Sequence, residues 1–176
     1  MQDCLERGLE FGINLVEEGH MHPIGCTAGI IDVTQRYPDG RMDVVVEGKQ
    51  RFQLLELKSN KHPYAVGEVE LQLDDDVPVD ASLTLECLSC YNTIVSLVYG
   101  PSALTLVYDE LGPCPSFEMA TKSGLSLEQK QELLEARSEQ SRLELLHEHL
   151  QKLVPMMKRA DSIQRIVQSN GYIKAL

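Results

Sequence analysis

Long hydrophobic runs are missing from this sequence of 176 residues. No apolar stretch approaches the roughly 20 residues that are needed to span a bilayer. The first seven residues contain neither a basic cluster nor the apolar centre of a secretory signal. Internal repeats and low-complexity segments are also lacking. These absences predict a cytoplasmic protein, and the length is sufficient for one domain, or two small packed subdomains, with a core of its own.

Basic residues are in the minority, because 16 Lys and Arg against 27 Asp and Glu give a formal net charge of −11. An acidic field repels nucleic acid and anionic lipid unless a local basic patch opposes it. The basic side chains are scattered, and the pair Lys158–Arg159 is too short to form such a patch. The five cysteines, an odd number without an export signal, predict free thiols in a reducing compartment. We therefore expect no membrane partner and disfavour a nucleic-acid partner.

Residues 1–77 have the pattern of short antiparallel strands. The runs 10–16 and 26–35 predict the first two strands, and Tyr37-Pro38-Asp39-Gly40 predicts a tight turn after them. Alternating apolar residues then predict strands within 42–46, 52–57 and 64–73. The alternation slips at Leu54–Leu55, which indicates a bulge or burial on both faces. Short antiparallel strands with tight turns favour a compact closed or nearly closed barrel.

Residues 78–176 change to a helical period. The first predicted helix spans 83–98 and is ended by Gly100–Pro101. Ser126 and Gln129 form a capping box, in which the serine oxygen and the glutamine side chain can each accept a hydrogen bond from an otherwise unpaired backbone amide at the helix start. The helix after this box is expected to run to about Ala136. A further helix carries an apolar stripe over 143–153 and is expected to end at Pro155. A last helix carries apolar residues over 160–167 and is expected to end near Asn170–Gly171.

Five segments occur in an informative order: FGINLV at 11–16, GCTAGI at 25–30, PDGR at 38–41, EGKQRF at 47–52 and LSLEQKQELLE at 125–135. This order and spacing resemble the amino-terminal domain of Lon proteases, and RLELL at 142–146 continues the match. The resemblance implies an α+β fold in which a PUA-like pseudo-barrel of antiparallel strands (1–77) precedes a small helical bundle (78–176), together one domain. In Lon proteases this domain helps to recognise damaged or unfolded substrates.

The resemblance therefore implies a non-catalytic module that binds unfolded or exposed polypeptide segments, as an adaptor or regulator of proteolysis in a stand-alone bacterial family member. The ATPase and serine–lysine peptidase of Lon proteases are not expected, because the chain has no G-x-x-x-x-G-K-[ST] motif. Family members usually open with a proline- and leucine-rich strand ahead of what is Met1 here. We expect a barrel that lacks this first strand, whose open edge recruits a strand from a partner or forms a homodimer.

Several groupings that could carry chemistry have simpler explanations. Cys87 and Cys90 form a C-x-x-C pair, but one pair lacks two further zinc ligands and lies within a helix, so we expect a buried structural thiol at Cys87. The other candidate ligands, His20, His22 and Cys26, would need their loop to fold onto that helix. His147 and His149 do not have the i, i+4 spacing of a zinc protease, and we expect them to be solvated. Asp74–Asp76 lacks the spacing of a calcium loop. We predict no cofactor, no metal and no catalytic residue.

The candidate binding surface consists of apolar side chains in loops. Methionine and aromatic side chains suit tolerant recognition of exposed apolar segments. Met21, Tyr37 and Tyr64 lie near turns of the predicted barrel, and Phe117 and Met119 lie in the linker before the capping box. For Phe117 and Met119 the alternative is packing between barrel and bundle.

Two other classes of function remain open. A PUA-like barrel also suits a nucleic-acid binder, although the acidic charge counts against it. A thiol hydrolase would need a nucleophile at Cys4, Cys26 or Cys114 beside a histidine. No nucleophile elbow supports that second class.

Overall fold

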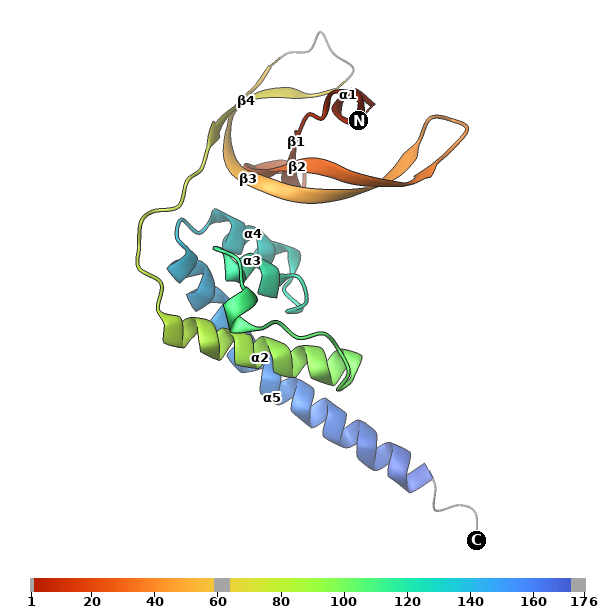
Figure 1. Cartoon of the computed structure of the whole chain (residues 1–176), viewed down its shortest axis with the longest axis vertical. Coiled ribbons are helices and arrows are strands. Elements are labelled where there is room, and N and C mark those ends of the chain that lie inside the picture. Colours follow the sequence, from red (N-terminus) through yellow and green to blue (C-terminus); the bar gives the residue numbers. More distant parts are fainter. Residues whose placement is uncertain (1, 59–63, 172–176) are drawn as a thin grey trace. The chain divides into compact units, whose positions relative to one another are not determined.

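The computed structural model describes residues 2–58 and 64–171, and the chain divides into two compact units, Met1–Leu73 and Asp74–Leu176 (Figure 1). We call them the sheet unit and the helical unit. The division follows the change from β to α periodicity, because strands and helices bury their apolar residues at different spacings. The α+β class predicted from the sequence is confirmed.

The sheet unit begins with a short helix and continues as four antiparallel strands in the order β1-β2-β3-β4. Its elements are α1 (Gln2–Arg7), β1 (Phe11–Glu17), β2 (His20–Arg36), β3 (Met42–Lys58) and β4 (Val66–Leu71). β2 and β3 are each 17 residues long and form a curved ribbon (Figure 1). The two shorter strands expected around Gly48 are one strand, because Gly48 stays in the ladder opposite Ala28.

The predicted turn and bulge are both present. The Gly40 amide donates to the Tyr37 carbonyl at 3.0 Å, and Gly40 has a φ of 87°, which favours glycine. The register between β3 and β4 shifts between Leu54 and Glu56, so Leu55 is the extra residue of a bulge. Within the described residues, β1 and β4 lie at the two ends of the strand order, so the sheet is open and has two edges.

Phe52 is the one large apolar side chain that is fully buried in the described part of the sheet unit, with 2% of its surface exposed. The ring lies against the backbone of β1 and β2 at Gly12 and Gly25. A Cβ added to Gly25 would lie 2.7 Å from the ring and 2.5 Å from the carbonyl oxygen of Ile13. Glycine is therefore required at position 25, because a side chain there would collide with the Phe52 ring and with the backbone of β1.

The helical unit contains α2 (Ala81–Tyr99), the 3₁₀ turn η1 (Tyr108–Glu110), α3 (Pro115–Ala120), α4 (Leu127–Glu135) and α5 (Glu139–Gly171). α2 begins where the Asp80 side chain accepts from the Ser82 amide at 2.8 Å. The capping box predicted at Ser126 and Gln129 is confirmed, and α4 follows it. α3 lies in the segment that was expected to be a linker.

Side chains from α2, α3, α4 and α5 form one apolar core in this unit. By length and composition alone, α2 could cross a membrane, but a single helix of this kind is weak evidence for a membrane span. Cys87, Tyr91 and Ile94 of α2 are buried in this core.

α5 is a single helix of 33 residues that passes through Pro155, where the sequence predicted an end. A proline inside a helix removes one amide donor, here for the carbonyl of Gln151. Gln151 and Pro155 are both exposed, so water can hydrogen-bond to that carbonyl. The last part of α5 extends beyond the other helices of the unit (Figure 1).

Candidate functional site

The sheet unit exposes a group of apolar side chains on neighbouring strands. Leu57 of β3 is 52% exposed, and Val69 and Leu71 of β4 are 44% and 51% exposed. Alternate residues of a strand share a face, and residues paired across an antiparallel ladder point the same way. Leu57 pairs with Gly67, two residues before Val69, so all three side chains lie on one face. We call Leu57, Val69 and Leu71 the apolar sheet patch.

The apolar sheet patch lies beside both the core of the unit and a free edge. Phe52 pairs with Leu71, so the buried ring lies on the same face as the patch. β4 is an end strand of the order, and its outer edge has no partner strand among residues 2–58 and 64–171. An unpaired strand edge offers backbone donors and acceptors to an incoming strand. The sheet unit therefore offers an incoming strand both apolar contacts, at the apolar sheet patch, and backbone hydrogen bonds, at the adjacent edge of β4.

Two of the predicted candidates are exposed in the sheet unit. Met21 lies in β2 opposite Val16 of β1, and both side chains are exposed. Tyr64, just before β4, is also exposed. Tyr37 is half-buried at the turn after β2, where its hydroxyl donates to Asp43 at 2.8 Å and the Arg41 guanidinium lies 5.2 Å from its ring centre. Tyr37 thus contacts its own turn.

The other two candidates lie within the helical unit. Met119 is 0% exposed and belongs to the core of the helical unit, so it is not available as part of an exposed binding surface. Phe117 is half-buried against that core, with the Arg142 guanidinium 4.7 Å from its ring centre. Both residues belong to α3, a helix that the sequence analysis did not predict because Gly112 and Pro113 beside it are typical of loops.

Arg142 is fully buried at the centre of a polar network. It donates to Glu139 at 2.9 Å, to the carbonyl of Ala136 at 3.1 Å, and through two nitrogens to Asp74. Burial alone would lower the pKa of Arg142, but the hydrogen bonds that it donates to Asp74 and Glu139 outweigh burial and raise the pKa. Glu139 also accepts from the Ser116 hydroxyl at 2.8 Å. The network connects Asp74, at the start of the helical unit, to α3 and α5. Ser116 is fully buried, so its hydroxyl is not accessible to a substrate.

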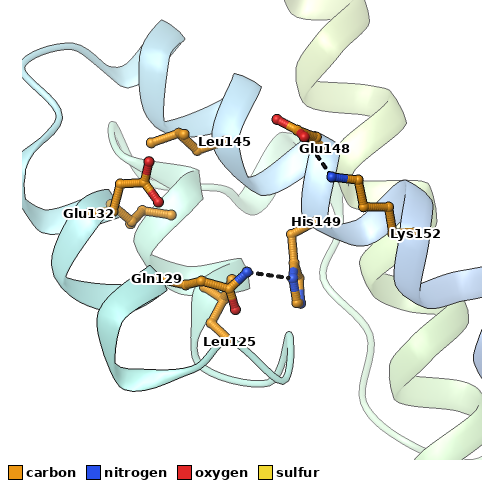
Figure 2. Close-up of a pocket in the computed structure, with 8 residues that line it drawn as sticks. Leu125, Gln129, Glu132, Leu145, Glu148, His149 and Lys152 are labelled. Atoms are coloured by element: carbon orange, nitrogen blue, oxygen red, sulfur yellow. Dashed lines mark hydrogen bonds and ion pairs between the residues drawn. The ribbon is translucent and has the colours of Figure 1, made fainter.

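A small pocket lies between α4 and α5, with a volume of about 270 Å³ (Figure 2). His149 accepts from Gln129 through Nδ1 at 3.2 Å and donates from Nε2 to the Ser123 carbonyl at 2.8 Å. His147 lies 3.0 Å from Glu86 of α2. The expectation that both histidines are solvated is therefore wrong, because each is half-buried and holds a neighbouring element. The remaining polar lining consists of Glu132 and of Glu148 and Lys152, which form an exposed ion pair.

The cysteines are free and show no sign of an activated thiolate. Cys87 is fully buried, as predicted, and donates to the Leu143 carbonyl at 3.4 Å. Burial, with smaller contributions from Cys90 and Glu86, raises the pKa of Cys87 to about 12. Burial also raises the pKa values of Cys26, Cys90 and Cys114. A nucleophilic cysteine needs the opposite shift.

Metal-ligating side chains do not gather into a site in residues 2–58 and 64–171, where no group of three or more such residues could hold an ion. The rings of His20 and His22 lie edge to face with centres 6.2 Å apart in β2. Cys87 and Cys90 belong to α2, in the other unit.

The apolar sheet patch was not among the predicted candidates. The sequence predicted its strands through the alternation of apolar residues, but alternation normally marks the buried face of a strand. Nothing in the sequence distinguishes an apolar face that packs inside the chain from one that stays open. The bulge at Leu55 was a partial signal, since bulges are frequent at sheet edges.

The structure thus defines a module made of an open antiparallel sheet with an exposed apolar face, followed by helices. Solved structures share this fold. The Lon N-terminal domain protein from Xanthomonas campestris is similar with a TM-score of 0.59 at 23% identity, over 82% of this chain and 78% of that one. The N-terminal domain of the Mycobacterium avium complex Lon protease gives 0.56 at 18% identity, over 81% and 77%. No curated protein matches the chain.

A family model identifies the protein family to which the chain belongs. The model of the ATP-dependent protease La (LON) substrate-binding domain matches residues 2–152. The chain therefore belongs to the LON substrate-binding domain family, as the resemblance of the five segments predicted. The family match describes a substrate-binding module and includes neither an ATPase nor a peptidase domain.

Proposed function

We propose that this chain binds exposed, extended polypeptide segments at the apolar sheet patch and the outer edge of β4, and serves as a cytoplasmic adaptor or regulator of proteolysis. The observation that carries the proposal is an exposed apolar face beside an unpaired strand edge, in a member of a substrate-binding family.

An extended segment fits both parts of this surface. Its backbone pairs with the edge of β4, while alternate side chains rest on Val69 and Leu71. Backbone hydrogen bonds do not depend on sequence, and the patch has no charged group that would demand a particular partner side chain. Recognition is therefore tolerant and selects segments that are unfolded and apolar, which folded proteins keep buried.

The two other classes of function receive less support. A nucleic-acid binder needs a basic surface, whereas the formal charge is −11. A thiol hydrolase needs a lowered thiol pKa, whereas burial raises the pKa values of Cys26 and Cys114.

The test replaces two residues of the patch in the full chain, Val69→Thr together with Leu71→Thr. Threonine keeps the preference for β structure but removes apolar surface. Each side chain is about half-exposed, so its complete burial by a ligand contributes about 1 kcal/mol. Loss of both should weaken binding of a reduced, carboxymethylated, fluorescent model protein roughly thirtyfold in an anisotropy titration.

A matched control removes equally exposed apolar side chains from the helical unit, Val98→Thr together with Leu127→Thr. This variant should bind as tightly as the original chain. Equal weakening by the two double variants would show that the sheet unit has no special part in binding. Binding of labelled RNA with the same affinity as the unfolded protein would favour the nucleic-acid class.

A further inference from the structure

The final part of α5 carries exposed apolar side chains that the substrate-binding family does not account for. The family match ends at residue 152, whereas α5 continues to Gly171. Beyond that point Met156 is 64% exposed, Ile163 is 63% exposed and Val167 is 66% exposed. Exposed side chains of this size on a projecting helix are typical of a surface that binds another protein.

The spacing of these residues is that of a coiled coil. Leu153, Met156, Ala160, Ile163 and Val167 are separated by three, four, three and four residues. This is the a/d pattern of a heptad, and it places a narrow apolar stripe along one side of the helix. We call these five residues the α5 seam. Leu153, its first member, is half-buried against the core, so the seam continues directly from the folded unit.

The polar residues of the segment keep the seam accessible to another helix. Lys158 and Arg165 lie at the heptad positions most distant from it, and Arg165 pairs with Asp161 at 3.0 Å on that far side. The positions flanking the seam include Arg159 and Gln164 and carry no acidic residue. Two such helices can therefore approach without repulsion between carboxylates.

Charge also favours another copy of this chain as the partner. Residues 74–152 contain fourteen acidic and five basic residues, whereas residues 153–171 contain one acidic and three basic residues. If two seams pack in opposite directions, the basic end of each α5 points toward the acidic helical unit of the other copy. A lipid surface is disfavoured, because the chain is acidic overall and has no tryptophan to anchor a helix at the interface.

We propose that the α5 seam binds a second copy of the chain as a short antiparallel coiled coil. With two-fold symmetry, Ala160 packs against Ile163 of the second copy, and Met156 packs against Val167 of the second copy. Each layer then combines a smaller and a larger side chain, which fills the interface without voids. The seam is only two heptads long, so the dimer is weak and depends on concentration.

The first test is sedimentation equilibrium of the full chain over a range of concentrations. The original chain should shift from the monomer mass of 19.7 kDa toward twice that mass as concentration rises. Ile163→Glu should weaken the dimer at least about tenfold, because a carboxylate would be buried without a partner. Ser162→Glu makes the same charge change outside the seam and should leave the dimer unchanged.

A second pair of variants tests the direction of packing. In the antiparallel arrangement Arg159 lies beside Ile166 of the second copy, whereas in a parallel one it would lie beside Gln164. Ile166→Glu should therefore strengthen the dimer a few-fold relative to Gln164→Glu. The reverse order would overturn the antiparallel arrangement.

Three results would overturn the proposal as a whole. The first is a chain that stays monomeric at every concentration. The second is a dimer that Ile163→Glu does not affect, which would point instead to pairing through the open edge of β4. The third is binding to phosphatidylglycerol vesicles that Ile163→Glu abolishes, which would make lipid the occupant of the α5 seam. None of these outcomes depends on the proposed binding of polypeptide by the sheet unit.

Discussion

The sheet unit and the helical unit differ in where they place their apolar residues. The helical unit buries eleven hydrophobic residues in one cluster, to which four helices contribute side chains. In the described part of the sheet unit, only Ala28 and Phe52 are buried hydrophobic residues, while many valines, leucines and isoleucines of its strands are exposed. Burial of apolar surface is the main favourable term in folding. We therefore expect the helical unit to hold most of the stability, whereas the sheet unit leaves many of its own apolar residues exposed.

This comparison separates the part of the chain with a large buried core from the part with exposed apolar residues on its strands. The exposed part of an apolar side chain contributes nothing to stability until a partner covers it. The sheet unit keeps such residues on a hydrogen-bonded framework, and the polar network of Arg142 fixes the start of the neighbouring unit independently. The difference predicts that the two units respond separately to substitution.

The largest effect is expected from Phe52→Ala, which removes the main core side chain of the sheet unit. A buried phenylalanine contributes about 4 kcal/mol relative to alanine. With so small a core, the sheet unit should unfold while the helical unit stays intact. Hydrogen exchange measured by mass spectrometry should show loss of protection over β2 and β3 and no change over α2.

The matched control for this variant is Leu71→Ala, in which the side chain that is lost was about half-exposed on the same face. It should leave most of the protection of the sheet in place. If Phe52→Ala removed protection from α2 as well, the two units would unfold as one, and the separation argued above would be wrong.

A smaller effect is expected in the other unit from Arg142→Met. Methionine fills a similar volume but leaves the carboxylates of Asp74 and Glu139 without their buried partner. Removal of one member of a buried ion pair costs about 3 kcal/mol. Urea unfolding followed by circular dichroism at 222 nm should show this loss in the helical transition.

Arg137→Ala is the comparison variant, because Arg137 also pairs with an aspartate, Asp75, but on the surface. An exposed pair contributes about 0.5 kcal/mol. Similar losses in the two variants would show that the Arg142 network contributes no more than a surface ion pair.

The sequence predicted local features best where only a few residue types can adopt the required backbone geometry or form the required hydrogen bond. The turn at Gly40 and the capping box of Ser126 are examples, since few residue types adopt a positive φ and few side chains can cap an unpaired helix amide. At Leu54–Leu55 the sequence left a bulge or burial on both faces open, because a slip in alternation has few structural causes, and the structure shows the bulge.

Features that depend on tertiary surroundings were predicted less well. Pro155 was taken as the end of a helix, but its position on an exposed face lets water replace the lost hydrogen bond. For Met119 both a surface position and a packed position were left open, because a short helix between glycine and proline residues gives no periodic signal. The apolar sheet patch was missed because alternation records which residues share a face and does not record what covers that face.

The smallest effect is expected from Ser126→Ala at the start of α4. The Ser126 side chain accepts from the Gln129 amide at 3.2 Å, and the Gln129 side chain accepts from the Ser126 amide at 2.9 Å. Gln129 also donates to His149, so the box connects the start of α4 to α5. Loss of a serine cap costs about 1 kcal/mol. Urea unfolding should show this loss, while hydrogen exchange in β2 and β3 stays unchanged.

Ser162→Ala provides the control for the cap, because Ser162 donates only to the carbonyl of Lys158 on the projecting part of α5. Its effect should stay within about 0.5 kcal/mol, as for most surface substitutions. A change in the exchange of β2 or β3 caused by Ser126→Ala would mean that stability passes from the helical unit to the sheet unit. The sheet would then depend on its neighbour for more than covalent attachment, and the exposed apolar sheet patch could not be treated as an independent binding surface.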